Sequence, residues 1–185
     1  MQLVSGVEHF QRVVVDGICS AKISVDLMTA DFKAMLIPDG RRRARSIVEH
    51  FRRLADRGVE IRLLHAGVPS SAALQELRRE LPGGLTIRRC PRLHSKAVII
   101  DSRLLYLGSA NLTGAGLGAK ADGRRNFELG IMTAQPDWID RVSGEFNALW
   151  EGRHCPGCGR RDVCPVPLEE PQLLIKAAVV RRRAS

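Results

Sequence analysis

The sequence has few aromatic residues and no long apolar run. Its 185 residues include two Trp, one Tyr and five Phe. A membrane-spanning helix needs about 20 consecutive apolar residues, and aromatic side chains commonly anchor proteins at a lipid interface. We therefore expect no transmembrane segment, and a lipid-directed function is disfavoured.

Acidic residues are also scarce relative to basic ones. The chain has 29 Lys and Arg against 20 Asp and Glu, a net charge of +9 and a pI near 10.0. Arginine runs lie at 41–45 and 181–183. Either run alone is typical of a solvated surface, but the overall charge favours a polyanionic partner such as nucleic acid.

The cysteine count is odd, and no secretory signal precedes the first cysteine. The five cysteines are Cys19, Cys90, Cys155, Cys158 and Cys164. This pattern argues against a disulfide framework and for a reducing compartment. We expect a cytoplasmic protein.

A motif with fixed spacing lies between residues 94 and 111: H-x-K-x4-D-x6-G-S-x-N. Its members are His94, Lys96, Asp101, Ser109 and Asn111, with Gly108 before the serine. Runs of β-branched and aliphatic residues on both sides of residues 101–103 predict a β-hairpin. A two-residue loop at 102–103 would place Lys96 opposite Ser109 and His94 opposite Asn111.

Because side chains alternate between the two faces of a strand, this register places four of these groups on one face. Asp101 would point to the other face. An imidazole, a fixed cation, a hydroxyl and an amide together suit a phosphodiester, whose transition state spreads negative charge over oxygens that need positioned donors. The alternative is a core histidine and a surface lysine on an ordinary hairpin.

The motif resembles the HKD signature of the phospholipase D superfamily. The resemblance implies that His94 attacks phosphorus to form a phosphohistidine, while Lys96 and Asn111 hold the non-bridging oxygens and Asp101 is structural. Residues 126–128 (Asn-Phe-Glu) resemble the N-x-E segment of the family, whose glutamate, here Glu128, hydrogen-bonds the nucleophilic histidine. The implied chemistry needs no metal or other cofactor.

A second H-x-K is absent among the five histidines. The family's chemistry uses two such motifs, the second supplying the histidine that protonates the leaving group. We therefore expect a homodimer that forms through the active-site face, with the two His94 side chains facing each other across a two-fold axis.

Periodicity predicts helices at 5–18, 44–56, 72–80 and 136–150, and strands at 22–28 and 59–64 in addition to the hairpin. Alternating helices and strands predict an α/β sandwich around a mixed sheet, flanked by helices as in the phospholipase D fold. Residues 1–152 would form the catalytic domain, 153–165 a Cys-rich knuckle and 166–185 a basic tail. Residues 113–125 read as a long, flexible basic loop beside the site.

The C-terminal extension contains His154, Cys155, Cys158 and Cys164. The spacing C-x2-C lets two thiolates converge on one ion, with Cys164 as a third ligand and His154 or a cysteine from elsewhere as a fourth. Zinc is the commoner occupant, an iron–sulfur cluster is the alternative, and three free thiols remain a third interpretation. Its distance in sequence from His94 predicts a structural site apart from the chemistry.

Three functions remain open. The first is a metal-independent, dimeric endonuclease acting on DNA or RNA. The second is a phospholipase or phosphatidyltransferase. The third is a non-catalytic nucleic-acid-binding subunit, with protein partners in a larger complex such as a bacterial defence system. The intact set of His94, Lys96, Asn111 and Glu128 argues against lost catalysis.

Overall fold

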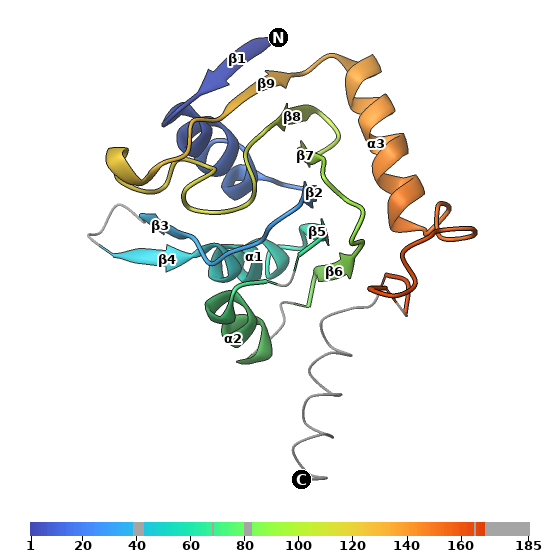
Figure 1. The fold of residues 1–185 in the computed structure, drawn as a ribbon. Coiled ribbons are helices and arrows are strands. Elements are labelled where there is room, and N and C mark those ends of the chain that lie inside the picture. The colour runs from blue at the N-terminus through green and yellow to red at the C-terminus, as the bar shows by residue number, and fades with distance from the viewer. Residues whose placement is uncertain (39–42, 68, 80–82, 165, 169–185) are drawn as a thin grey trace, which may run out of the picture.

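The computed structural model describes residues 1–38, 43–67, 69–79, 83–164 and 166–168, without the side chains of 78 and 79. Its centre is a seven-stranded mixed sheet in the order β1-β9-β8-β7-β2-β5-β6 (Figure 1). The strands are β1 Gln2–Ser5, β2 Ser24–Thr29, β5 Glu60–His65, β6 Leu85–Arg89, β7 Lys96–Ile100, β8 Leu104–Gly108 and β9 Leu129–Thr133. Strands β2, β5 and β6 are parallel, and the other pairings are antiparallel. The mixed sheet confirms the predicted α/β class.

Helices cover both faces of the sheet. The π-helix η1 (His9–Val15), the short η2 (Ile18–Ser20), α1 (Ile47–Ala55) and α2 (Ser71–Arg79) lie on one side, and α3 (Pro136–Trp150) lies on the other (Figure 1). Strand β7 packs against both layers because its side chains alternate: Val98 and Ile100 belong to the larger core, while Ala97 and Ile99 belong to the core under α3. None of the helices in these ranges is both long and apolar enough to cross a membrane.

Helix α1 begins later than the apolar periodicity predicts. Residues Ala44–Ser46 form β4, which pairs with β3 (Leu36–Pro38) in a separate two-stranded sheet. The Ser46 hydroxyl accepts the backbone N–H of Glu49 at 3.1 Å and so caps the helix. Of the predicted basic runs, Arg41, Arg42 and residues 181–183 lie outside the described residues.

The end of α3 is fixed against the neighbouring strand β6. The Arg88 guanidinium lies 4.8 Å from the centre of the Trp150 ring and donates a hydrogen bond to the Trp150 carbonyl. Trp150 also stacks on Phe146 within the core under α3. The chain therefore leaves α3 beside the carboxyl end of β6.

The predicted register of the β7–β8 hairpin is wrong by one residue. Lys96 pairs with Gly108 rather than Ser109, and Ile100 pairs with Leu104, which leaves a three-residue loop at 101–103. Asp101 and Ser102 both adopt left-handed backbone conformations, with φ of 52° and 51°. This loop is longer than the predicted two-residue turn because Asp101 belongs to it instead of to the strand.

A long-range contact holds Asp101 in that loop. Its carboxylate accepts the backbone N–H groups of Lys22, Ile23 and Ser24, the shortest at 2.7 Å from Ile23. Partial burial raises the pKa of Asp101, but the N–H groups of Ser24, Ile23 and Lys22 lower it by more, so the pKa lies below its usual value. Asp101 therefore ties the hairpin to the start of β2.

We expect Asp101→Asn to lower the free energy of unfolding by about 1–2 kcal/mol at neutral pH, because it removes a charge that accepts several backbone N–H groups. Since the folded pKa is depressed, the wild-type advantage exists above the unfolded pKa and disappears as the pH falls through the folded pKa. Urea unfolding of both proteins at neutral and acid pH measures how the difference in their free energies of unfolding shrinks as the pH falls. Asp140→Asn, an exposed change on α3, is the control and should show neither effect.

Candidate active site

Four of the motif residues gather at one end of the sheet, namely His94, Lys96, Ser109 and Asn111, whereas Asp101 lies at the opposite end. Strands β2, β5 and β6 end there, at Thr29, His65 and Arg89, while β7 begins there at Lys96. Strand β8 ends at the same edge with Gly108, opposite Lys96, and β9 begins beside it. In open α/β sheets, ligands commonly bind outside the carboxyl ends of the parallel strands. The motif therefore occupies the usual position for a site in this class of fold.

His94 and Lys96 are adjacent but differ in exposure. His94 is exposed on the segment that enters β7, whereas Lys96 is 8% exposed. The Lys96 ammonium donates to the His94 carbonyl at 2.7 Å and lies 3.3 Å from Nδ1 of the His94 ring. A buried ammonium is costly without partners, and this backbone bond helps hold it in place. The result is a fixed positive charge behind a solvent-facing imidazole.

Ser109 and Glu128 form a pair of their own. The Ser109 hydroxyl donates to one oxygen of Glu128, and the other oxygen accepts from Nδ2 of Asn126 at 3.1 Å. Ser109 also accepts the backbone N–H of Leu129 at 3.1 Å. In the described part of this single chain no hydrogen bond joins Glu128 to His94, contrary to the sequence prediction. The Glu128 carboxylate contacts Ser109 instead. In the observed register Lys96 pairs with Gly108, and Ser109 lies beside Leu129 at the start of β9.

Asn111 holds the loop that follows β2. Its Oδ1 accepts the backbone N–H groups of Ala30 and Asp31, both at 3.1 Å. It also lies 3.3 Å from the Thr29 hydroxyl, which donates at the shorter distance of 2.7 Å to the Asp31 carbonyl. Since a backbone N–H can only donate, these contacts fix which end of the amide faces the loop. Among the residues with described coordinates, Nδ2 of Asn111 has no protein partner, so it remains available as a donor.

Thr29 is a residue of the site that no sequence motif indicates. This buried residue accepts the backbone N–H of Leu112 at 2.9 Å in addition to contacting Asn111. Its only sequence signal is a hydroxyl at the carboxyl end of a predicted strand. Its partner Asn111 lies 82 residues away, so the pairing depends on the fold.

The motif glycine, Gly108, has a packing role. A Cβ atom built there would lie 2.4 Å from the Tyr106 hydroxyl, and one built at Gly130 would lie 2.4 Å from the same ring. Burial raises the pKa of Tyr106 to about 12, so its hydroxyl stays protonated. The two glycines let Tyr106 pack under the strand ends that carry the site.

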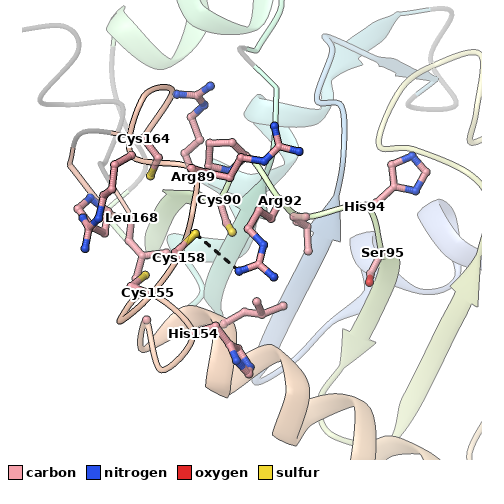
Figure 2. Close-up of a pocket in the computed structure, with 17 residues that line it drawn as sticks. Arg89, Cys90, Arg92, His94, Ser95, His154, Cys155, Cys158, Cys164 and Leu168 are labelled. Carbon is pink, nitrogen blue, oxygen red and sulfur yellow. Dashed lines mark hydrogen bonds between the residues drawn. The ribbon is translucent and has the colours of Figure 1, made fainter.

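A hollow of about 280 Å³ lies beside His94, and the C-terminal segment lines it (Figure 2). Its lining includes Arg89, Cys90, Arg92, His94, Ser95, His154, Cys155, Cys158, Arg160, Arg161 and Cys164. The cysteine segment therefore lines the same hollow as His94, while its independence from the chemistry stays a prediction. The segment reaches this hollow because of the anchoring of α3, which returns the chain to the carboxyl end of β6.

The predicted metal ligands share this hollow but do not form a closed site. All five cysteines are free thiols. Within the described ranges, no three His, Cys, Asp or Glu side chains are close enough to hold an ion as they stand. The hollow nevertheless brings a further cysteine, Cys90, beside Cys155, Cys158 and Cys164.

The basic loop at 113–125 is partly core, contrary to the expectation of a flexible loop. Leu117 is 2% exposed, and a Cβ built at Gly116 would lie 2.7 Å from the Asn111 carbonyl. The helical turn η3 (Asp122–Arg124) follows, and the exposed basic residues are Lys120 and Arg124. Only the second half of this loop is thus a candidate for contact with substrate.

Comparison with known proteins identifies the family to which the chain belongs. The family model described as "Cardiolipin synthase, PLD-like domain" matches residues 14–150. The chain belongs to the phospholipase D superfamily, as its motif predicts. A comparison with curated proteins gave no match.

Solved structures support the same fold. The phospholipase D family member Nuc from Salmonella typhimurium superposes with a TM-score of 0.59 at 24% identity, covering 81% of this chain and 93% of Nuc. NucT from Helicobacter pylori gives a TM-score of 0.59 at 17% identity, covering 81% and 94%. TrmBL2, an archaeal chromatin protein, gives 0.50 at 15% identity, covering 81% of this chain and 51% of TrmBL2.

Proposed function

We propose that the protein is a metal-independent phosphodiesterase that cleaves nucleic acid, with DNA as the first candidate. The observation that carries this proposal is the buried Lys96 ammonium held against the exposed His94 at the end of the sheet. This arrangement offers a nucleophile and a fixed charge for a phosphate at one point. The free Nδ2 of Asn111, beside the end of β2, adds a neutral donor.

The reaction would proceed in two displacements. A ring nitrogen of His94 attacks phosphorus, and the bond to the leaving oxygen breaks as that oxygen takes a proton from the partner subunit's His94. The partner's His94 then takes a proton from water, which attacks phosphorus and releases His94. Lys96 and Asn111 hold the non-bridging oxygens in both steps, and Glu128 positions Ser109 at the rim of the site.

Charge around the site favours nucleic acid over a neutral lipid. Arg89, Arg160 and Arg161 line the hollow beside His94, and Lys120 and Arg124 are exposed on the loop after Asn111. Guanidinium and ammonium groups along a groove bind the phosphates of a nucleic-acid backbone. The DNA binding stated for TrmBL2 also favours a second candidate, a non-catalytic DNA-binding subunit.

An apolar rim beside Glu128 favours a dimer. The Phe127 side chain is fully exposed, and Leu129, Leu3 and Val7 are 61%, 66% and 56% exposed. Leu129 begins β9, which pairs with β1 at the edge of the sheet. Contiguous exposed apolar groups commonly mark an interaction surface. A two-fold contact here would bring a second copy of the motif toward the first.

Incubation with supercoiled plasmid and with phosphatidylcholine vesicles, both in EDTA, tests the proposal. We expect the plasmid to be nicked or linearised, the lipid to remain intact, and the rate on DNA to be unchanged by EDTA because Lys96 replaces a metal. A strict requirement for magnesium would indicate a different mechanism. Lipid hydrolysis without DNA cleavage would support a phospholipase, and DNA binding without cleavage would support the non-catalytic subunit.

A further inference from the structure

We infer that Cys90, Cys155, Cys158 and Cys164 form a structural site for one Zn²⁺ ion, with Cys90 as the fourth ligand. Four of the five cysteines in the chain line the hollow shown in Figure 2. Three come from the C-terminal segment, and Cys90 comes from the turn after β6. Figure 2 shows the sulfur atoms of these four cysteines around the same hollow.

The backbone around Cys155 and Cys158 has the form of a metal-binding turn. The backbone N–H of Cys158 donates to the Cys155 carbonyl at 3.1 Å, and Gly157 takes a positive φ of 71°. Such a C-x2-C turn can direct two sulfurs toward one point. Arg92, which also lines the hollow, donates a hydrogen bond to the Cys158 sulfur at 3.6 Å.

Cys90 is a better fourth ligand than His154. Its backbone is fixed on both sides, since its N–H donates to the His65 carbonyl at 2.8 Å and its carbonyl accepts from Leu93 at 2.9 Å. Its thiol is half-buried in the hollow, whereas His154 is exposed. A structural zinc site is closed by four tetrahedral ligands, and the three C-terminal thiols leave one position empty.

The C-terminal segment also needs a source of stability. Residues 152–164 and 166–168 contain no helix or strand, and Val163 and Val166 are 44% and 51% exposed. Leu168 is the main apolar contact that this segment makes with the core under α3. A short segment with so little apolar burial is commonly stabilised by metal or disulfides. Since no three of the described ligand groups converge as they stand, binding would draw the four thiolates together.

The metal content of the 185-residue chain and the spectrum of its Co²⁺-substituted form test the site. We expect about one zinc per chain, and thiolate-to-cobalt bands with the intensity of four sulfurs. Cys90→Ser should weaken zinc binding by about a hundredfold or more in chelator competition. Substituting a residue that only contacts a ligand commonly weakens metal affinity by up to about a hundredfold, and loss of a ligand should cost at least as much. The variant should also lower the intensity of the cobalt bands. Cys90→His, which restores a zinc ligand, should recover most of the affinity.

Two variants serve as controls. Cys19→Ser removes the one cysteine outside the hollow and should leave zinc content and the cobalt spectrum unchanged, as should His154→Ala. Unchanged zinc affinity in a folded Cys90→Ser protein would overturn the assignment of Cys90, and loss of zinc in His154→Ala would transfer that position to His154. Failure of the wild type to bind zinc or cobalt, or the presence of iron with acid-labile sulfide, would overturn the zinc site. None of these readouts depends on phosphodiesterase activity.

Discussion

His94→Ala protein should hydrolyse phosphodiesters about a thousandfold or more slowly than wild type while keeping its fold. The expected loss is that of the proposed nucleophile acting within a coupled unit. His94 is exposed, so its removal leaves no cavity in the core. Single-turnover cleavage of plasmid, with circular dichroism as the check on folding, measures the effect.

Two further variants separate the roles within the site. Ser95→Ala changes the exposed neighbour of His94 and is the matched control, which should retain wild-type rates. Glu128→Gln should lower the rate less than His94→Ala, because Glu128 contacts Ser109 rather than the imidazole in this chain. The assignment fails if His94→Ala retains activity, or if Asp101→Asn abolishes it in a fully folded protein while Glu128→Gln has no effect.

Phe127→Glu should convert the protein into an inactive monomer. In the proposed dimer, the two introduced carboxylates would face each other across the two-fold axis and repel, so the subunits would separate. Each active site would then lose the partner subunit's His94. We expect activity at equal chain concentration to fall by about a hundredfold or more, the contribution expected of general acid–base catalysis. Sedimentation equilibrium and plasmid cleavage on the same samples would measure both changes.

The matched control is Ile23→Glu. Ile23 is 61% exposed like the rim residues, but it lies beside Asp101 at the opposite end of the sheet. This variant should remain dimeric and active. Hybrids of wild-type and His94→Ala subunits should also have little activity, because each composite site needs both histidines. A Phe127→Glu monomer with full activity would contradict the shared site.

The elements with strong local signals could be predicted from the sequence. The apolar spacing of Ile47, Phe51 and Leu54 gave α1, and Pro136 marked the start of α3. The register of the hairpin could not be predicted, because the contact that fixes Asp101 is made by backbone N–H groups at 22–24. No local rule connects residues so far apart in the chain.

The site divides in the same way. His94 and Lys96 are two residues apart, so their contact follows from a local motif. The pairs Thr29–Asn111 and Ser109–Glu128, and the place of Cys90 beside Cys158, depend on strand order and on the course of α3. Residue types and spacing therefore identified the participants, whereas their partners required the tertiary structure.

The length of α3 has an evolutionary consequence. Its 15 residues extend about 22 Å, at 1.5 Å per residue, and Arg88 fixes its final residue, Trp150. The length of α3 therefore determines where the cysteine segment begins relative to β6. Inserting or deleting one residue would rotate everything after it by about 100° and carry the cysteines away from Cys90. Homologues that keep all four cysteines should therefore tolerate substitutions along the exposed side of α3 but no change in its length.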